Sequence, residues 1–220
     1  TLEKMRDDLS RLQPLIEAYE GESAEELWEI VHPYLAQNPF AHCALDEAAH
    51  DFFAKKQQKK LYEYWGLRPE RLPLTNYTIG IDTPEKMVEK LLEMPWPIYK
   101  IKLGTADDLG LVRILRQHTQ AAFRVDANCA WTADQTLAYA PELKALGVEF
   151  IEQPLPAHDV AGMRRVRAES VLPVIADESC IVPADVAACA ELFDGINIKL
   201  TKCGGLTPAR RMIAEARSRG

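Results

Sequence analysis

Hydrophobic and polar positions follow two different periods along the chain, and the change falls near residue 74. Before it, apolar residues recur at helical spacing, and the stretch SAEELWEIVHPYL opens with Ser23 and Glu26 in the order typical of a capping box. Gly66 is expected to end this region, which is therefore predicted to be helical throughout. A central helix is expected over residues 38–57, with a buried stripe formed by Phe40, Cys43, Ala44, Ala48, Phe52 and Phe53.

From residue 74 on, short β-rich runs alternate with amphipathic stretches at a repeat near 24 residues. Strand followed by helix at this spacing predicts parallel βα units, in either a doubly wound sheet or a (β/α)₈ barrel. The GxGxxG turn of a dinucleotide-binding sheet follows none of the runs. We therefore predict an α/β fold of the (β/α)8-type, a TIM-like barrel that is here incomplete, with six βα units. The runs cover residues 76–81, 99–103, 123–127, 150–153, 173–177 and 195–200.

Charged residues recur where five successive predicted strands end. Taken singly, each has an ordinary explanation, such as an aspartate that caps a helix or a lysine on a solvated edge strand. Inward positions of a barrel are normally aliphatic, however, and barrel active sites are assembled from the C-terminal ends of several strands. Five charged residues in phase therefore predict a functional site at that end of the sheet. They are Lys102, Asp126, Glu152, Asp177 and Lys199, at steps of 24, 26, 25 and 22 residues.

The three acidic residues of this series predict a metal site. Asp126, Glu152 and Asp177 would repel one another if no positive charge lay between them. A divalent cation resolves the repulsion, and an all-oxygen ligand set without histidine or cysteine favours a hard ion, Mg²⁺ first and Mn²⁺ as its substitute. Asn128 lies two residues after Asp126 on the same predicted strand face, where its amide would support the ligands or contact a substrate.

The lysines predict a proton-transfer reaction. In a ring of eight strands the second and sixth lie opposite each other, so Lys102 and Lys199 would face one another across the site. Such a pair suits a reaction in which one lysine removes a proton from carbon and the other returns one to the opposite face. Lys100 shares a strand face with Lys102, and its positive charge disfavours protonation of Lys102, which makes Lys102 usable as a base.

Composition limits the class of protein. The 220-residue chain has a net charge of −7, which argues against nucleic acid or an anionic membrane as its main partner. Nothing in the sequence has the pattern of a signal peptide or of a membrane span. Reduced thiols in a cytoplasmic protein are expected, because the cysteines are scattered and form no CxxC pair: Cys43, Cys129, Cys180, Cys189 and Cys203.

Five motifs in order carry a resemblance to a known family: KIKLG, RVDAN, IEQPLP, IADES and NIKLTKCGG. Together they resemble the barrel of the enolase superfamily in its muconate-lactonizing subgroup, and they are most similar to dipeptide epimerases of the Ala-Glu epimerase type. The resemblance implies an Mg²⁺-dependent isomerase that inverts the α-carbon of a dipeptide, or of a related small-molecule carboxylate, through an enolate. It also implies that Asp126, Glu152 and Asp177 are the magnesium ligands.

The same resemblance implies roles for further residues. Lys102 and Lys199 match the catalytic acid/base pair, and Lys100 matches a lysine that contacts the substrate carboxylate. Thr78, in TNYTIGID, matches a substrate-contacting position on the first strand. Capping-domain barrels of this kind are often oligomers, so the resemblance allows a homo-oligomer.

The resemblance extends over nearly the whole chain but departs from the family at both ends. Residues 1–72 are similar to the helical part of the family's α+β capping domain, and residues 73–220 to barrel strands 1–6. The capping-domain sheet and strands 7 and 8 have no counterpart, and a ring of six strands cannot close. The chain is therefore expected to be a fragment of a longer gene product, or a sequence from which parts are absent.

Other functions use the same motifs. Within the subgroup, o-succinylbenzoate synthase, N-acylamino acid racemase and muconate-type cycloisomerase share the arrangement of lysines and acids. A non-catalytic truncated barrel, kept as a structural or binding subunit, is the alternative of another class. A Schiff-base aldolase would also use a lysine on the sixth strand, but it leaves the three carboxylates unexplained.

Overall fold

The computed structural model of the chain describes residues 1–220, with the exception of the Arg71 side chain. Two compact units share the chain. The helical unit comprises Thr1–Leu72, Ile181–Val186 and Ile198–Gly220, and the sheet unit comprises Pro73–Cys180 and Ala187–Asn197. The chain first passes from the helical unit to the sheet unit between Leu72 and Pro73, and it returns to the helical unit at Ile181–Val186 and from Ile198 onward. The assignment of these parts to a capping domain and a barrel domain remains a prediction.

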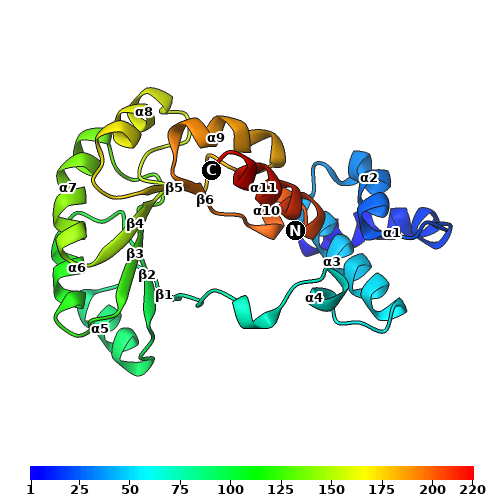
Figure 1. The fold of residues 1–220 in the computed structure, drawn as a ribbon, viewed down its shortest axis with the longest axis horizontal. Helices are drawn as coiled ribbons and strands as arrows, with labels where there is room; N and C mark the ends of the chain where they lie inside the picture. The colour runs from blue at the N-terminus through cyan, green and yellow to red at the C-terminus, as the bar shows by residue number, and fades with distance from the viewer. The chain divides into compact units, whose positions relative to one another are not determined.

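The sheet unit is built on a parallel sheet whose six strands lie in sequential order (Figure 1). One helix follows each of the first five strands, so the repeating βα units and the α/β fold class predicted from the sequence are confirmed. The strands are β1 (Tyr77–Ile79), β2 (Ile98–Lys102), β3 (Ala122–Asp126), β4 (Val148–Glu152), β5 (Val174–Ala176) and β6 (Gly195–Ile196). The helices are α5 (Pro84–Glu93), α6 (Asp108–Arg116), α7 (Ala133–Ala145), α8 (Val160–Glu169) and α9 (Val186–Leu192).

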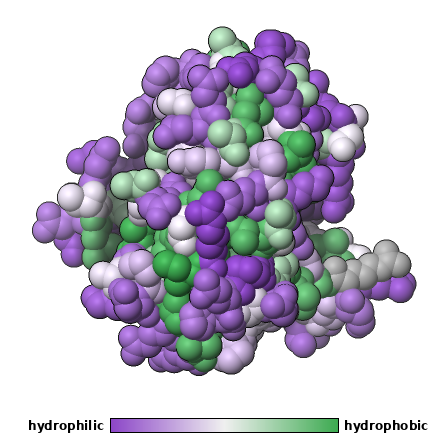
Figure 2. Space-filling view, turned by 90° about the vertical axis from the view of Figure 1, so that its left-hand side faces the viewer, coloured by the Kyte–Doolittle hydropathy of each residue, from purple (hydrophilic) through white to green (hydrophobic). Residues whose placement is uncertain are grey.

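The two faces of the sheet differ in polarity, as β2 illustrates. Tyr99 and Ile101 are buried, and the alternating residues Lys100 and Lys102 lie on the opposite face. The apolar face meets the helices: the guanidinium of Arg116, at the end of α6, lies 3.7 Å from the ring centre of Phe123 on β3. Figure 2 views this helix-covered side, which is mainly hydrophilic with hydrophobic side chains interspersed. The charged face of the sheet is therefore the face on which a functional site can form.

The last strand is shorter than predicted. The pattern placed a strand over residues 195–200, but β6 ends at Ile196. Asn197 still donates a backbone hydrogen bond to Ala176 on β5 (2.7 Å), and Lys199 is the N-cap residue of the one-turn helix α10 (Leu200–Cys203). The prediction that Lys199 ends a strand is therefore wrong: β5, with which β6 pairs, ends at Ala176, and Lys199 lies in extended backbone three residues beyond β6 and directly before α10.

The helical unit packs four N-terminal helices with the last segment of the chain. It contains α1 (Leu2–Glu17), α2 (Ala24–Leu35), α3 (Pro39–Lys56), α4 (Leu61–Tyr64), the 3₁₀ turns η1 (Pro69–Arg71) and η2 (Pro183–Asp185), α10 and α11 (Leu206–Ser218). Ser23 caps α2 by accepting from the Glu26 backbone (3.1 Å), but the Glu26 carboxylate binds the Tyr19 hydroxyl (2.9 Å). The predicted capping box is thus only half formed. Among the described helices, none combines the length and apolar character needed to cross a membrane.

Helix α3 buries a different face from the one predicted. Phe40 and Phe52 are 55% and 59% exposed, and Ala44 and Ala48 are exposed as well. Cys43 and Phe53 are buried as predicted, but the face is completed by polar side chains and small residues: Ala41, His42, Asp46, Ala49, His50 and Ala54. The predicted apolar stripe does not coincide with the buried face of α3, because polar residues of α3 lie on that face and pair with α11.

Candidate functional site

Three carboxylates meet at the carboxyl edge of the sheet. Asp126 is the last residue of β3, Glu152 is the last residue of β4, and Asp177 directly follows β5. Asp126 and Glu152 are in register, and the carboxyl ends of parallel strands lie along one edge. Each of the three buried side chains offers an oxygen, and these oxygens all lie within 4.8 Å of one another. The sequence-predicted triad is therefore brought together.

Two lysines of β2 contact this cluster. The ammonium of Lys100 lies 2.9 Å from Asp126 Oδ2 and 2.6 Å from Glu152 Oε2, and that of Lys102 lies 2.6 Å from Asp126 Oδ2. Buried carboxylates are costly without a counter-charge, and the alternation of β2 supplies two positive charges on the face where they are needed. The arrangement combines a potential cation site with amines at hydrogen-bonding distance from its ligands.

The ion pairs shift the pKa values of these groups in different directions. Burial alone would raise the pKa of Asp126, but hydrogen bonds from Lys102 and Lys100 outweigh it and hold this pKa below its ordinary value. Burial raises the pKa of Glu152, and the hydrogen bond from Lys100 offsets the rise only in part. Burial would lower the pKa of Lys100, but hydrogen bonds to Glu152 and Asp126 raise it. Asp126 is therefore the more readily ionised of the two carboxyl groups.

Asn128 reaches the same cluster by a local turn. Its backbone N–H donates to Asp126 Oδ1 (3.0 Å), and its side-chain Oδ1 accepts from Lys102 (3.1 Å). The φ angle of Asn128 is +46°, a left-handed conformation that asparagine tolerates better than most residues. Asn128 therefore lies beside Asp126, but in a turn beyond the end of β3 and not on the predicted strand face, and its side chain contacts Lys102. A role beside the metal ligands or at the substrate remains a prediction.

The sequence analysis did not identify two amide side chains, one of which contacts a carboxylate of the cluster and the other the backbone of Asp177. Asn197 donates from Nδ2 to Glu152 Oε1 (2.7 Å). Gln153 is fully buried, and its Oε1 accepts from the backbone N–H groups of Asp177 (2.9 Å) and Ser179 (3.1 Å). Alternation along GINIK could have pointed to Asn197, which precedes Lys199 by two residues. Only the pairing of β4 with β5 shows that Gln153 positions Asp177.

The other two predicted residues belong to different units of the chain. Thr78 is exposed on β1 and is paired in register with Lys100, so it shares the charged face. Lys199 belongs to the helical unit, where its carbonyl accepts from the N–H groups of Lys202 (2.9 Å) and Cys203 (3.1 Å). A substrate contact at Thr78 and a position of Lys199 opposite Lys102 both remain predictions.

The fold and the site together indicate the class of protein: a parallel α/β sheet carries acidic side chains at three neighbouring strand ends. The chain belongs to the enolase C-terminal domain-like family, whose sequence profile matches residues 84–220. This assignment confirms the family resemblance found in the five motifs.

Particular relatives are similar over the whole chain. An L-Ala-D/L-amino acid epimerase of Flavobacterium johnsoniae is 53% identical over 220 residues, which is 100% of this chain and 66% of the relative. The substrate-liganded L-Ala-D/L-Glu epimerase of Bacillus subtilis matches with a TM-score of 0.91 at 27% identity, covering 100% of this chain and 65% of that structure. A dipeptide epimerase of Methylococcus capsulatus, in complex with Mg and L-Arg-D-Lys, matches with a TM-score of 0.85 at 33% identity and the same coverage. The chain thus spans just under two thirds of the length of these relatives.

Proposed function

We propose that this chain is part of an Mg²⁺-dependent dipeptide epimerase. The observation that carries the proposal is the cluster of Asp126, Glu152 and Asp177 in contact with the two lysines of β2. Family membership and the similarity to dipeptide epimerases support the substrate class. The reaction is a 1,1-proton transfer at the carbon next to a carboxylate.

The donor set fits magnesium. It consists of carboxylate oxygens alone, and their mutual spacing of within 4.8 Å suits ligands of one small cation. Asp126, Glu152 and Asp177 would hold the ion, with Mn²⁺ as a substitute. A divalent cation bound there supplies positive charge that stabilises the negative charge developing on the substrate during proton removal.

The lysines are proposed to move the protons. The Cα–H bond breaks, its proton passes to one lysine amine, and the electron pair is delocalised into the neighbouring carboxylate as an enolate. The other lysine gives a proton to the opposite face, which inverts the carbon. Lys102 and Lys199 take these two roles, while Lys100, Asn128 and Thr78 contact the substrate.

Solvent exchange tests the proposed function. The protein is incubated in D₂O with Mg²⁺ and each of a panel of dipeptides that includes L-Ala-L-Glu, and α-deuterium is followed by NMR. We expect deuterium at the α-carbon of one residue together with the appearance of the second epimer. Absence of incorporation with every dipeptide would refute the proposal. Exchange or elimination without the second epimer would instead favour a one-base reaction of the same subgroup.

Asn197 gives a prediction about metal affinity. Asn197→Ala removes the hydrogen bond to Glu152 Oε1, so we expect Mg²⁺ to bind about 10- to 100-fold more weakly, as measured by titration calorimetry. Asn76→Ala is the matched control, because its amide accepts from Arg124 (2.7 Å) and contacts none of the three carboxylates. Unchanged affinity in Asn197→Ala would show that this amide does not orient a ligand.

A further inference from the structure

The segment that follows Lys102 is held by a buried aspartate and an indole. The Asp108 carboxylate accepts from the backbone N–H groups of Gly104 (3.0 Å) and Thr105 (2.8 Å) and from the Thr105 hydroxyl (2.7 Å). Trp131 donates from its indole N–H to the same carboxylate (2.7 Å). Gly104 lies two residues after Lys102 and has a φ of +115°, which favours glycine. All of these contacts lie within the sheet unit.

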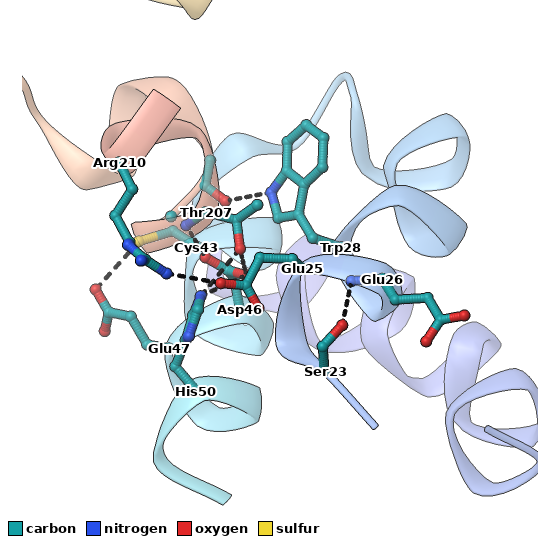
Figure 3. A network of polar contacts seen from close by, with 12 residues as sticks. Ser23, Glu25, Glu26, Trp28, Cys43, Asp46, Glu47, His50, Thr207 and Arg210 are labelled. Carbon is teal, nitrogen blue, oxygen red and sulfur yellow. Dashed lines mark hydrogen bonds and ion pairs between the residues drawn. The ribbon is translucent and has the colours of Figure 1, made fainter. Parts of the chain in front are cut away.

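The segment that follows Lys199 is also held by a buried aspartate and an indole, which Figure 3 shows, but here the indole binds the segment's backbone and not the aspartate. Asp46 of α3, only 2% exposed, accepts from the Thr207 backbone N–H (2.8 Å) and the Thr207 hydroxyl (2.7 Å). Trp28 of α2 donates from its indole N–H to the Gly204 carbonyl (3.1 Å). These contacts lie within the helical unit.

The approach of Asp46 to this segment requires glycine. Gly205 has a φ of +128°, and a Cβ placed there would lie 2.3 Å from Asp46 Oδ2. The single turn of α10 connects Lys199 with Gly204, and the Lys199 carbonyl is engaged in that turn. The backbone of Lys199 is thereby tied to α2 and α3.

Burial of these aspartates needs a reason other than stability. A buried carboxylate is costly to desolvate, and well-packed apolar residues often replace buried charges without loss of stability. Several hydrogen bonds to one carboxylate do, however, fix the geometry of the groups that donate them. Exposed ion pairs such as Arg211 with Glu29 also join α11 to α2, but such pairs contribute little.

We infer that two independent pairs of residues position the two lysines. Asp108 with Trp131 holds residues 104–105, which follow Lys102, and Asp46 with Trp28 holds residues 204–207, which follow Lys199. Each pair is called a positioning clamp below. The inference rests on the proposed function and adds that each clamp affects proton exchange from only one of the two epimers. In a two-lysine reaction each amine removes the proton from only one of the two epimers. A clamp that positions one lysine therefore governs exchange from one epimer, and the clamps share no residue.

Matched substitutions test the inference. Trp28→Phe and Trp131→Phe each remove one indole N–H and keep an aromatic ring, and Thr207→Val and Thr105→Val remove one hydroxyl from each clamp. Initial rates of α-deuterium incorporation are measured separately from the two epimers of one dipeptide, with folding checked by circular dichroism. We expect up to about 10²-fold slower exchange, because small displacements of a catalytic group have effects of that size. The ratio of the two epimer rates should move in opposite directions for the two clamps.

Each outcome bears on the inference. Trp28→Phe or Thr207→Val should slow the epimer that is silenced in Lys199→Ala, and Trp131→Phe or Thr105→Val the epimer silenced in Lys102→Ala. Equal slowing of both epimers, unchanged rates, or loss of folding in both variants of one clamp would overturn the positioning role. Absence of exchange in the unsubstituted protein would instead contradict the proposed function, and the inference with it.

Discussion

Lys199→Ala is expected to abolish epimerisation while leaving the α-proton of one epimer in exchange with solvent. The remaining amine of Lys102 can still remove a proton from the face that it serves and return deuterium to that same face. The opposite epimer has lost its base, so its exchange should fall by about 10²- to 10⁴-fold, the usual contribution of a general base. Proton NMR of each purified epimer in D₂O measures both rates.

Lys102→Ala should give the mirror image, with exchange retained only in the epimer that Lys199 serves. Lys86→Ala is the control, because this lysine is 65% exposed on α5 and pairs with Asp82. It should change neither rate. If both epimers lose exchange equally in Lys199→Ala and in Lys102→Ala, the two lysines do not act as opposed bases.

Glu152→Gln is expected to suppress exchange from both epimers to the same degree. The substitution keeps the shape of the side chain and removes the charge that would bind a cation and that pairs with Lys100. Cation stabilisation of the developing negative charge is worth several kcal/mol, which corresponds to about 10³-fold or more in rate. The loss should be accompanied by weaker Mg²⁺ binding in titration calorimetry.

The symmetry of the effect distinguishes a metal ligand from a base, since the cation serves both directions of the reaction. Glu149→Gln is the matched control on the same strand, where the carboxylate pairs with Arg124 (2.9 Å) and takes no part in the acidic cluster. The Glu149→Gln variant should bind Mg²⁺ with unchanged affinity. A one-sided loss of exchange in Glu152→Gln, or undiminished Mg²⁺ binding, would contradict the assignment of Glu152 as a ligand.

Strand positions could be predicted because successive side chains on a half-buried strand alternate between the two faces of the sheet. In YKIKL the apolar residues face the helices and the lysines face away, so the pattern shows both the strand and its charged side. The repeat of one βα unit then brings Asp126, Glu152 and Asp177 to a common edge without any knowledge of their contacts. This part of the site follows from local periodicity and parallel topology.

The buried face of α3 could not be predicted in this way. Asp46 and His50 lie on it because Thr207, more than 150 residues later in the chain, binds both side chains. Helical periodicity ranks residues by hydrophobicity and therefore assigns such polar residues to solvent. The burial of Asp46 depends on a partner that local sequence does not contain.

The sequence by itself determined the order of the strands, the parallel fold and the position of Lys102, Asp126, Glu152 and Asp177 at the carboxyl ends of neighbouring strands, because these follow from spacing along the chain. Tertiary structure alone decided that Asn197 binds the Glu152 carboxylate and that Gln153 binds the backbone of Asp177. It also decided that aspartates within each unit bind the segments after the lysines. Hydrogen bonds between distant segments depend on distances of a few ångströms in the folded chain, and no periodicity of residue types encodes those distances.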